Sequence, residues 1–298
     1  MTYHQPALAS ESIEALAIRP GGTYVDATFG GGGHSRLILN ELGAEGRLLG
    51  FDQDEDALAN ILEDGRFTFV HHNFRFLKRF LRLHRIQEVD GILADLGVSS
   101  HQLDVAERGF SYRFDAALDM RMNQQQEKTA ATLVNTYDAE ALQELFSNYG
   151  EVRNARTLAQ RIVEERRHRP IETIGAFLAV VEPVIRGHRA RYLSQAFQAL
   201  RIEVNDEMGA LQEFLEQSLE VLKPGGRLAV ITYHSIEDRM VKNFLKAGNF
   251  EGRQEKDFYG NIQRPFKVIS RKAIIPSDEE VQQNPRSRSA KLRIGEKI

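Results

Sequence analysis

The chain has 298 residues, of which 42% are hydrophobic and 27% charged, and its 39 basic and 42 acidic residues give a formal net charge of −3. This composition excludes a disordered or fibrous chain, and any nucleic-acid surface must be local because the molecule as a whole is not basic. The absence of cysteine excludes disulfides, thiolate metal sites and a cysteine nucleophile. Without a secretory signal or a run of about 18 apolar residues, we expect a cytoplasmic protein that does not contact a membrane.

Strand-like and helix-like segments alternate over the first hundred residues. Strands are expected at 23–28, 47–52, 67–71 and 91–95, and helices between them at 34–42, 55–62 and 74–83. Such alternation predicts βαβ units and a parallel sheet that is covered on both faces.

The alternation stops after the fourth strand. Residues 127–204 have helical apolar spacing and almost no strand-like run, which predicts an inserted helical domain. We set its boundaries at 107–206, so that 1–106 and 207–298 together form one α/β domain.

Strand and helix signals resume after the insertion. An amphipathic helix is stopped by Lys223-Pro224-Gly225-Gly226, in the way that proline and glycine end helices. The expected elements are helices at 207–222 and 236–245, a fifth strand at 227–232, and closing strands at 266–275 and 290–294.

A glycine run and an acid mark a candidate ligand site. Gly30–Gly33 follows the first strand, where residues without Cβ let the backbone turn sharply and approach a ligand. Asp52 ends the second strand, at the distance from Gly30 that is usual for a carboxylate that holds a ribose diol. Both lie at the carboxyl edge of the sheet, where open α/β sheets bind ligands. The alternative is a turn that binds nothing.

The glycine spacing disfavours a dinucleotide. A G-x-G-x-x-G pattern would need its third glycine at Ser35 or Arg36, depending on where it starts. Asp26, on the first strand, would repel a pyrophosphate but suits the ammonium group of an amino acid. This combination favours S-adenosylmethionine over NAD, and a methyltransferase over an oxidoreductase.

Asp95 ends the fourth strand and is followed by a loop that continues to Gln102. In amino-methyltransferases this loop receives the exocyclic nitrogen, whose lone pair must be localised by hydrogen-bond acceptors before it attacks the methyl group. Asp95 is a candidate for that acceptor. The alternatives are a cofactor contact, which we favour, and a carboxylate that caps a turn. The Pro-Pro-aromatic sequence that is usual in such loops is absent here.

Several longer motifs resemble those of the bacterial 16S ribosomal RNA cytosine-N4 methyltransferases, the RsmH/MraW family. The resemblance spans nearly the whole chain and rests on DATFGGGGHS (26–35), DLGVSS (95–100), QLD (102–104), RGFS (108–111), LDMRM (118–122), FQALRI (197–202), HSIEDR (234–239) and NPRSRS (284–289). It implies a class I, Rossmann-like methyltransferase sheet with an inserted all-helical domain. It also implies S-adenosylmethionine as donor and N4-methylation of one cytidine in the decoding region of 16S ribosomal RNA.

The resemblance assigns cofactor contacts to seven residues of this chain, namely Gly32, Gly33, His34, Asp52, Phe74, Asp95 and Gln102. Phe74 could instead pack in the core, and His34 could be a solvated residue at a helix start. The sequence departs from the family at Ala116-Ala117, at Gln195, where arginine is common, and at Tyr233, where phenylalanine is frequent. We interpret the last change as mild.

His234 and Ser235 follow the fifth strand and so lie at the candidate active edge. His234 is our second candidate catalytic residue, because it could hold the target base. An equally good interpretation is a structural hydrogen bond to the helix that begins nearby. No metal site is expected.

The inserted domain has a local excess of arginine. Residues 151–201 contain ten Arg, no Lys and five acids. Arginine suits phosphate and exposed bases, so we expect 16S ribosomal RNA or the small ribosomal subunit as partner. A solvated face with intrahelical ion pairs is the alternative for any one of these residues. The other functions considered are DNA or protein methylation and a binding module with a vestigial cofactor site.

Overall fold

The computed structural model describes residues 6–254 and 264–298. The chain forms two compact units, unit 1 with Met1–Gly97 and Gly209–Ile298, and unit 2 with Val98–Met208. Within the described ranges no helix is both long and apolar enough to cross a membrane.

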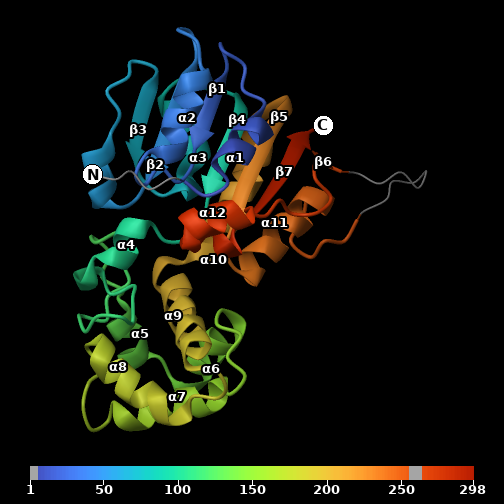
Figure 1. Cartoon of the computed structure of the whole chain (residues 1–298). Coiled ribbons are helices and arrows are strands. Elements are labelled where there is room, and N and C mark those ends of the chain that lie inside the picture. The colour runs from blue at the N-terminus through green and yellow to red at the C-terminus, as the bar shows by residue number, and fades with distance from the viewer. Residues whose placement is uncertain (1–5, 255–263) are drawn as a thin grey trace. The chain divides into compact units, whose positions relative to one another are not determined.

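Unit 1 is built on a seven-stranded sheet with the order β3-β2-β1-β4-β5-β7-β6 (Figure 1). The first five strands are parallel, whereas β7 is antiparallel to both β5 and β6. The α/β class and the Rossmann-like sheet expected from the sequence are confirmed. The strands are β1 (Thr23–Asp26), β2 (Arg47–Asp52), β3 (Phe67–His71), β4 (Val89–Asp95), β5 (Leu222–Thr232), β6 (Phe266–Val268) and β7 (Lys291–Lys297).

Helices cover the sheet. Side chains of α1 (Ala9–Leu16) and α2 (Gly33–Glu41) share one apolar cluster with Leu93 and Ile231 of the central strands. In α3 (Leu77–Leu83), the ring of Phe80 contacts Phe51 of β2. Most of α10 (Glu207–Val221) belongs to unit 1, and α11 (Ser235–Ala247) packs against β6 and β7. The parallel strands are therefore largely buried, as apolar β runs require.

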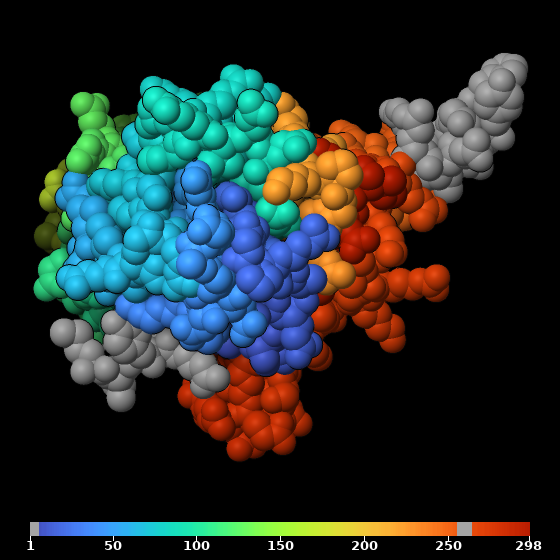
Figure 2. Space-filling model, turned by 90° about the horizontal axis from the view of Figure 1, so that it is seen from above, coloured from blue at the N-terminus to red at the C-terminus, as the bar shows by residue number. Residues whose placement is uncertain are grey.

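Figure 2 looks onto the end of unit 1 at which the parallel strands begin, where blue, orange and red segments meet. At this end, Lys223 of β5 forms an ion pair with Asp90 of β4 at 2.8 Å, and Arg227 of β5 forms one with Glu296 of β7 at 3.2 Å. A small polar cavity of about 120 Å³ lies between them. These two pairs join β5 to its neighbours on both sides.

Some elements differ from the expectation. The segment predicted as a helix at 55–62 is a 3₁₀ turn, η1 (Glu55–Asn60), and a second turn, η2 (Phe74–Phe76), precedes α3. The strand β5 starts earlier than predicted, because the Pro-Gly segment forms a bulge opposite β4. Several elements were not predicted, among them α1, α12 (Asp278–Gln283) and η5 (Pro285–Ser289). Ser277 caps α12 by accepting the Glu280 N–H.

Unit 2 is helical and has its own apolar core, which includes Leu133, Phe146, Leu158, Phe177 and Leu193. Its elements are α4 (Ser100–Asp104), η3 (Ala106–Arg108), α5 (Ala130–Thr136), α6 (Ala139–Asn148), α7 (Ala155–Glu165), α8 (Ile174–Val181), η4 (Glu182–Val184) and α9 (Arg189–Asn205). In Figure 1 the longer helices α6, α7 and α9 gather in one bundle.

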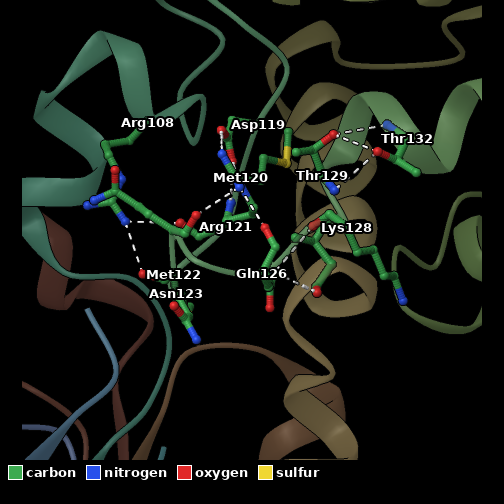
Figure 3. A network of polar contacts seen from close by, with 12 residues as sticks. Arg108, Asp119, Met120, Arg121, Met122, Asn123, Gln126, Lys128, Thr129 and Thr132 are labelled. Carbon is green, nitrogen blue, oxygen red and sulfur yellow. Dashed lines mark hydrogen bonds and ion pairs between the residues drawn. The ribbon is translucent and has the colours of Figure 1, made fainter. Parts of the chain in front are cut away.

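A polar network holds the loop before α5 (Figure 3). Asp119 forms an ion pair with Arg121 at 2.8 Å, and the buried Arg108 donates to the carbonyls of Arg121 and Met122. Gly109 has a φ of +76°, and a Cβ there would lie 2.7 Å from the Ala117 carbonyl. The methionines of the LDMRM motif are buried packing residues, so this motif shapes unit 2.

Candidate functional site

The glycine run forms a turn between β1 and α2. Gly30 and Gly32 have φ values of +51° and +73°, a region that favours glycine. A Cβ at Gly32 would lie 2.9 Å from Arg36 and 3.0 Å from the Phe29 ring, whereas a Cβ at Gly31 would meet nothing within 4 Å. The turn is therefore closely packed at Gly32 and open at Gly31.

Asp52 anchors this turn from the end of β2. Its Oδ2 accepts the Gly30 N–H at 2.7 Å, and its Oδ1 accepts the Asp54 N–H at 2.9 Å. Burial raises the pKa of Asp52 to about 6, although both N–H groups oppose that rise. Each carboxylate oxygen accepts only one of these bonds, so each keeps a lone pair with which it can accept a further donor, such as a hydroxyl of a ribose diol.

Asp26 lies deeper than the sequence interpretation assumed. It is completely buried, and its carboxylate accepts the Ser35 hydroxyl at 2.6 Å and the Thr28 N–H at 3.1 Å. Burial raises its pKa. The residue braces the turn from inside, so the suggestion that it faces a ligand's ammonium group is wrong.

His34 is also internal. Only 5% of it is exposed, which rules out a solvated helix start. Its Nε2 donates to the Ala7 carbonyl at 3.1 Å, and its Nδ1 lies 3.8 Å from Oδ2 of Asp95. The imidazole thus connects the start of α2 with the end of β4.

Asp95 stands at the carboxyl end of β4 with its side chain 22% exposed. Its Oδ1 accepts the Tyr233 hydroxyl at 2.8 Å, and its own N–H donates to the Thr28 hydroxyl at 2.7 Å. Burial raises the pKa of Asp95 to about 6, against the opposing effects of His34 and the Tyr233 hydroxyl. A partly open carboxylate with such a pKa can accept a hydrogen bond and a proton near neutral pH.

His234 is the N-cap of α11. Its Nδ1 accepts the Glu237 N–H at 3.4 Å, and its Nε2 lies 2.9 Å from Oε1 of Glu237. The other oxygen of Glu237 accepts the backbone N–H groups of Tyr233 and His234, which completes a capping box. The side chain therefore has the structural hydrogen bond that the sequence offered as an alternative.

Two further predicted cofactor residues lie in different units. Phe74 follows β3 in unit 1, half-buried, and its ring contacts Phe214 of α10 at 5.1 Å. Gln102 is buried in unit 2, where it and Ser99 form the capping box of α4. Unit 1 by itself gathers the glycine turn, His34, Asp52 and Asp95 at one edge of the sheet.

Sequence reasoning missed Tyr233 and Thr28 as parts of this site. The only signal for Tyr233 was its departure from the frequent phenylalanine. Thr28 lies within the DATFGGGGHS motif, but nothing in its local sequence indicates that its hydroxyl meets the N–H of Asp95.

The family model described as the MraW methylase family matches residues 1–298. The "Ribosomal RNA small subunit methyltransferase H" of Bacteroides thetaiotaomicron is 59% identical over 100% of this chain and 98% of its own length. The protein of the same name from Parabacteroides distasonis is 60% identical over 99% of this chain and 98% of its length. A solved structure titled as a putative rRNA-methylase from Clostridium thermocellum covers 100% of both chains with 15% identity and a TM-score of 0.45. The chain belongs to the MraW methylase family, whose methyl donor is S-adenosylmethionine.

Proposed function

We propose that this protein transfers a methyl group from S-adenosylmethionine to the N4 amino group of one cytidine in the decoding region of 16S ribosomal RNA. The names of its close relatives and the motifs quoted above support a small-subunit RNA substrate. The observation that carries the chemistry is Asp95, a partly open carboxylate at the end of β4 beside the glycine turn. The activity is expected in the cytoplasm, where small subunits are assembled.

The residues of unit 1 fit the donor. Asp52 has free lone pairs for a ribose diol, and the glycine turn is open at Gly31, where a Cβ would meet nothing within 4 Å. Phe74 offers an aromatic face after β3, and we assign Gln102 and His34 to the same cofactor set. When bound, S-adenosylmethionine would supply a methyl group that is activated by its bond to a sulfonium sulfur, and this sulfur would leave as a neutral thioether.

Asp95 prepares the nucleophile. The lone pair of a cytosine amino group is delocalised into the ring, and a carboxylate that accepts one N–H localises it on nitrogen. After the new C–N bond has formed, the nitrogen is positively charged and gives a proton to Oδ2 of Asp95, from which solvent removes it. His234 is the second candidate catalytic residue, with the role of holding the base at the turn between β5 and α11.

The ten arginines of residues 151–201 fall into two groups. Four of the ten are held by the protein: Arg161 by Glu165, Arg189 by Glu182, Arg201 by Glu207, and Arg166 by the carbonyls of Val134 and Tyr137. The other six are exposed, and no ion pair holds them within the described residues: Arg153, Arg156, Arg167, Arg169, Arg186 and Arg191. Within the first group, only the Arg161–Glu165 pair is the intrahelical ion pair of the alternative interpretation. The second group is available for phosphates.

Four of these exposed residues form what we call the Arg patch: Arg153, Arg156, Arg186 and Arg191. The two ends of the patch are adjacent, because Asn154 at the start of α7 donates to the carbonyl of Val184 at 2.9 Å. Gln195 in α9 also donates to the carbonyl of Glu151 at 3.4 Å. We assign substrate recognition to the inserted domain, with the Arg patch as its contact with the RNA backbone.

The proposed reaction is tested by mapping methylated cytidines in small-subunit RNA from cells with and without this protein. One N4-methylated cytidine in the decoding region should disappear and should return with the wild-type protein but not with D95N. Purified protein, offered naked RNA and assembled subunits with labelled donor, should modify the same position. Label that appears only in DNA or in protein would overturn the proposal in favour of the other acceptor classes.

A further inference from the structure

The hydroxyl of Tyr233 is directed at the candidate acceptor. Tyr233 follows β5, whose register places Ile231 beside Asp95 of the parallel neighbour β4. Its hydroxyl lies 2.8 Å from Oδ1 of Asp95, although the two residues are 138 positions apart in the sequence. Among the described residues, the other oxygen, Oδ2, has only the more distant Nδ1 of His34, at 3.8 Å.

Both the backbone and the ring of Tyr233 are held in place. Its backbone N–H donates to Oε2 of Glu237 at 3.1 Å, and its ring packs against the apolar cluster beneath α1 and α2. A Cβ built on Gly97 would lie 3.7 Å from the ring, in ordinary contact. The hydroxyl therefore reaches Asp95 from a rigid base.

The direction of this hydrogen bond is constant. Burial, Asp95, Glu237 and Glu280 all raise the pKa of Tyr233 far above its ordinary value, so the phenol stays protonated and donates. The other charged groups that act on Asp95 are His34 from α2, which favours its ionised form, and Asp26 from β1 and Glu237 from α11, which disfavour it.

We propose that Tyr233 is a positioning residue for Asp95, in that its hydroxyl holds Oδ1 and leaves Oδ2 as the oxygen that meets the target amino group. The proposal rests on the proposed function of Asp95 as acceptor. It replaces our interpretation of the phenylalanine-to-tyrosine departure as mild. Y233F removes the hydroxyl and keeps the ring that packs against the apolar cluster.

The test compares Y233F with wild type in single-turnover methylation across pH 5–9 at saturating donor. Wild type should lose activity below about pH 6, where Asp95 takes up a proton. In Y233F the midpoint of this loss of rate, the acid limb of the pH–rate profile, should move up by about one pH unit. The reason is that the carboxylate loses a hydrogen-bond donor. At pH 8 the rate should fall about threefold from lost orientation, and at pH 5.5 by about thirtyfold, since one pH unit adds a factor of about ten.

A second measurement reports on the contact without RNA. In protein labelled with ¹³C at the aspartate carboxyl groups, the Asp95 resonance is identified by its absence in D95N, and its titration should move up by the same amount in Y233F. Y24F is the matched control, since it removes a buried phenol on β1 that bonds the Arg19 N–H and not Asp95. Y24F should change neither the titration of the Asp95 carboxyl group nor the acid limb of the pH–rate profile.

These outcomes separate the two ideas. An Asp95 titration that is unchanged in Y233F overturns the positioning role, as does a titration that moves while the acid limb and the rate do not. Wild-type protein that methylates no small-subunit RNA would instead contradict the proposed function, and the carboxyl titration would still decide whether Tyr233 controls Asp95.

Discussion

At the residue scale, two carboxylates of unit 1 have a raised pKa for the same reason but have different partners. Burial raises the pKa of both Asp52 and Asp95 to about 6. Asp52 accepts backbone N–H groups, which fix its position relative to the glycine turn. Asp95 instead contacts the side chains of Tyr233 and His34. The first environment suits a binding residue and the second a residue whose protonation changes during a reaction.

Donor binding should depend on the ionisation of Asp52. Ribose hydroxyls donate more strongly to a carboxylate than to a carboxylic acid, so donor affinity should be constant above about pH 7 and fall up to tenfold per unit below pH 6. Calorimetric titration of wild type across pH 5–8 measures this. D52N should bind about 30-fold more weakly at pH 8 and lose most of the pH dependence. A wild-type affinity that stays flat down to pH 5 would remove Asp52 from the ribose site.

The variant D95N should separate catalysis from binding. At saturating donor and pH 8, its turnover should fall at least about 100-fold, because it loses the acceptor for the amino proton. Donor affinity should also weaken, since we assign Asp95 to the cofactor set as well. Single-turnover assays and calorimetry measure the two effects independently. A normal rate at saturation would leave Asp95 with a binding role only.

The same variant should stabilise the donor-free fold. The folded-state pKa of Asp95 lies above its ordinary value, so the unfolded chain loses its proton first as pH rises from about 4 to 6. Ionisation in that window therefore costs stability, and the cost persists at higher pH. D95N should raise the free energy of unfolding by about 3 kcal/mol at pH 8 and by little at pH 4. Urea unfolding at both pH values measures this difference, and an equal effect at the two would show that ionisation is not the cause.

At the element scale, the start of α11 combines a cap with the candidate catalytic histidine. His234 accepts the Glu237 N–H, and Glu237 returns bonds to the backbone of Tyr233 and His234. The turn between β5 and α11 is thereby fixed at the active edge. Any effect of a His234 variant on activity can come from this turn as well as from the imidazole.

Two substitutions distinguish these roles. H234A removes the cap and should lower the free energy of unfolding by about 1 kcal/mol, whereas H234N keeps a side chain that caps well. If His234 holds the base, both variants should lose turnover by similar factors while only H234A loses stability. Thermal unfolding and single-turnover assays provide the two readouts. Full activity in H234N would assign His234 to the cap alone.

The sequence predicted the elements whose signals are local. Alternating strands and helices, the glycine turn and the acids at strand ends follow from short patterns, and the structure has them where expected. The segment at 55–62 was predicted as a helix, but Asp54 caps a 3₁₀ turn there. The early start of β5 depends on a bulge opposite β4, which no pattern within the segment indicates.

At the scale of the whole molecule, the Arg patch should determine how RNA binding depends on salt. Changing Arg153, Arg156, Arg186 and Arg191 together to Gln removes four exposed charges that no ion pair holds in the described structure. If all four contact phosphates, the slope of log affinity against log salt should become about 3 units less steep. Filter binding of small-subunit RNA between 50 and 300 mM salt measures the slope, and calorimetry should show unchanged donor affinity.

A matched variant tests whether the position of the charge matters. Arg161 and Arg189 are paired with Glu165 and Glu182, so R161Q/R189Q should change the slope much less than the same number of changes in the patch. Arg166 is unsuitable for this purpose, because it holds two carbonyls of unit 2 and its loss would disturb the fold. Equal slopes in wild type and the patch variant would direct the search to Arg167 and Arg169, and then to the basic segment at 286–293.

Contacts between distant segments limited what could be predicted about the site. Each acid was identified from its place at a strand end, but the bond between Asp95 and Tyr233 depends on the pairing of β4 with β5. The division of the arginines depends on which glutamate or carbonyl each one reaches in the folded helices. The inserted helices were recognised by their periodicity, whereas the compact unit begins at Val98, and Val98 and Leu103 pack against its core.

The pairing of β4 with β5 around unit 2 has a consequence for how the protein folds. These neighbouring strands are separated by the whole of unit 2, so their first encounter closes a very long loop. If unit 2 forms its own core early, its compact body shortens that loop and lowers the entropic cost of closure by about 2 kcal/mol. Completion of the sheet would then be about 30-fold faster, and substitutions in the core of unit 2 would slow the folding of the sheet of unit 1.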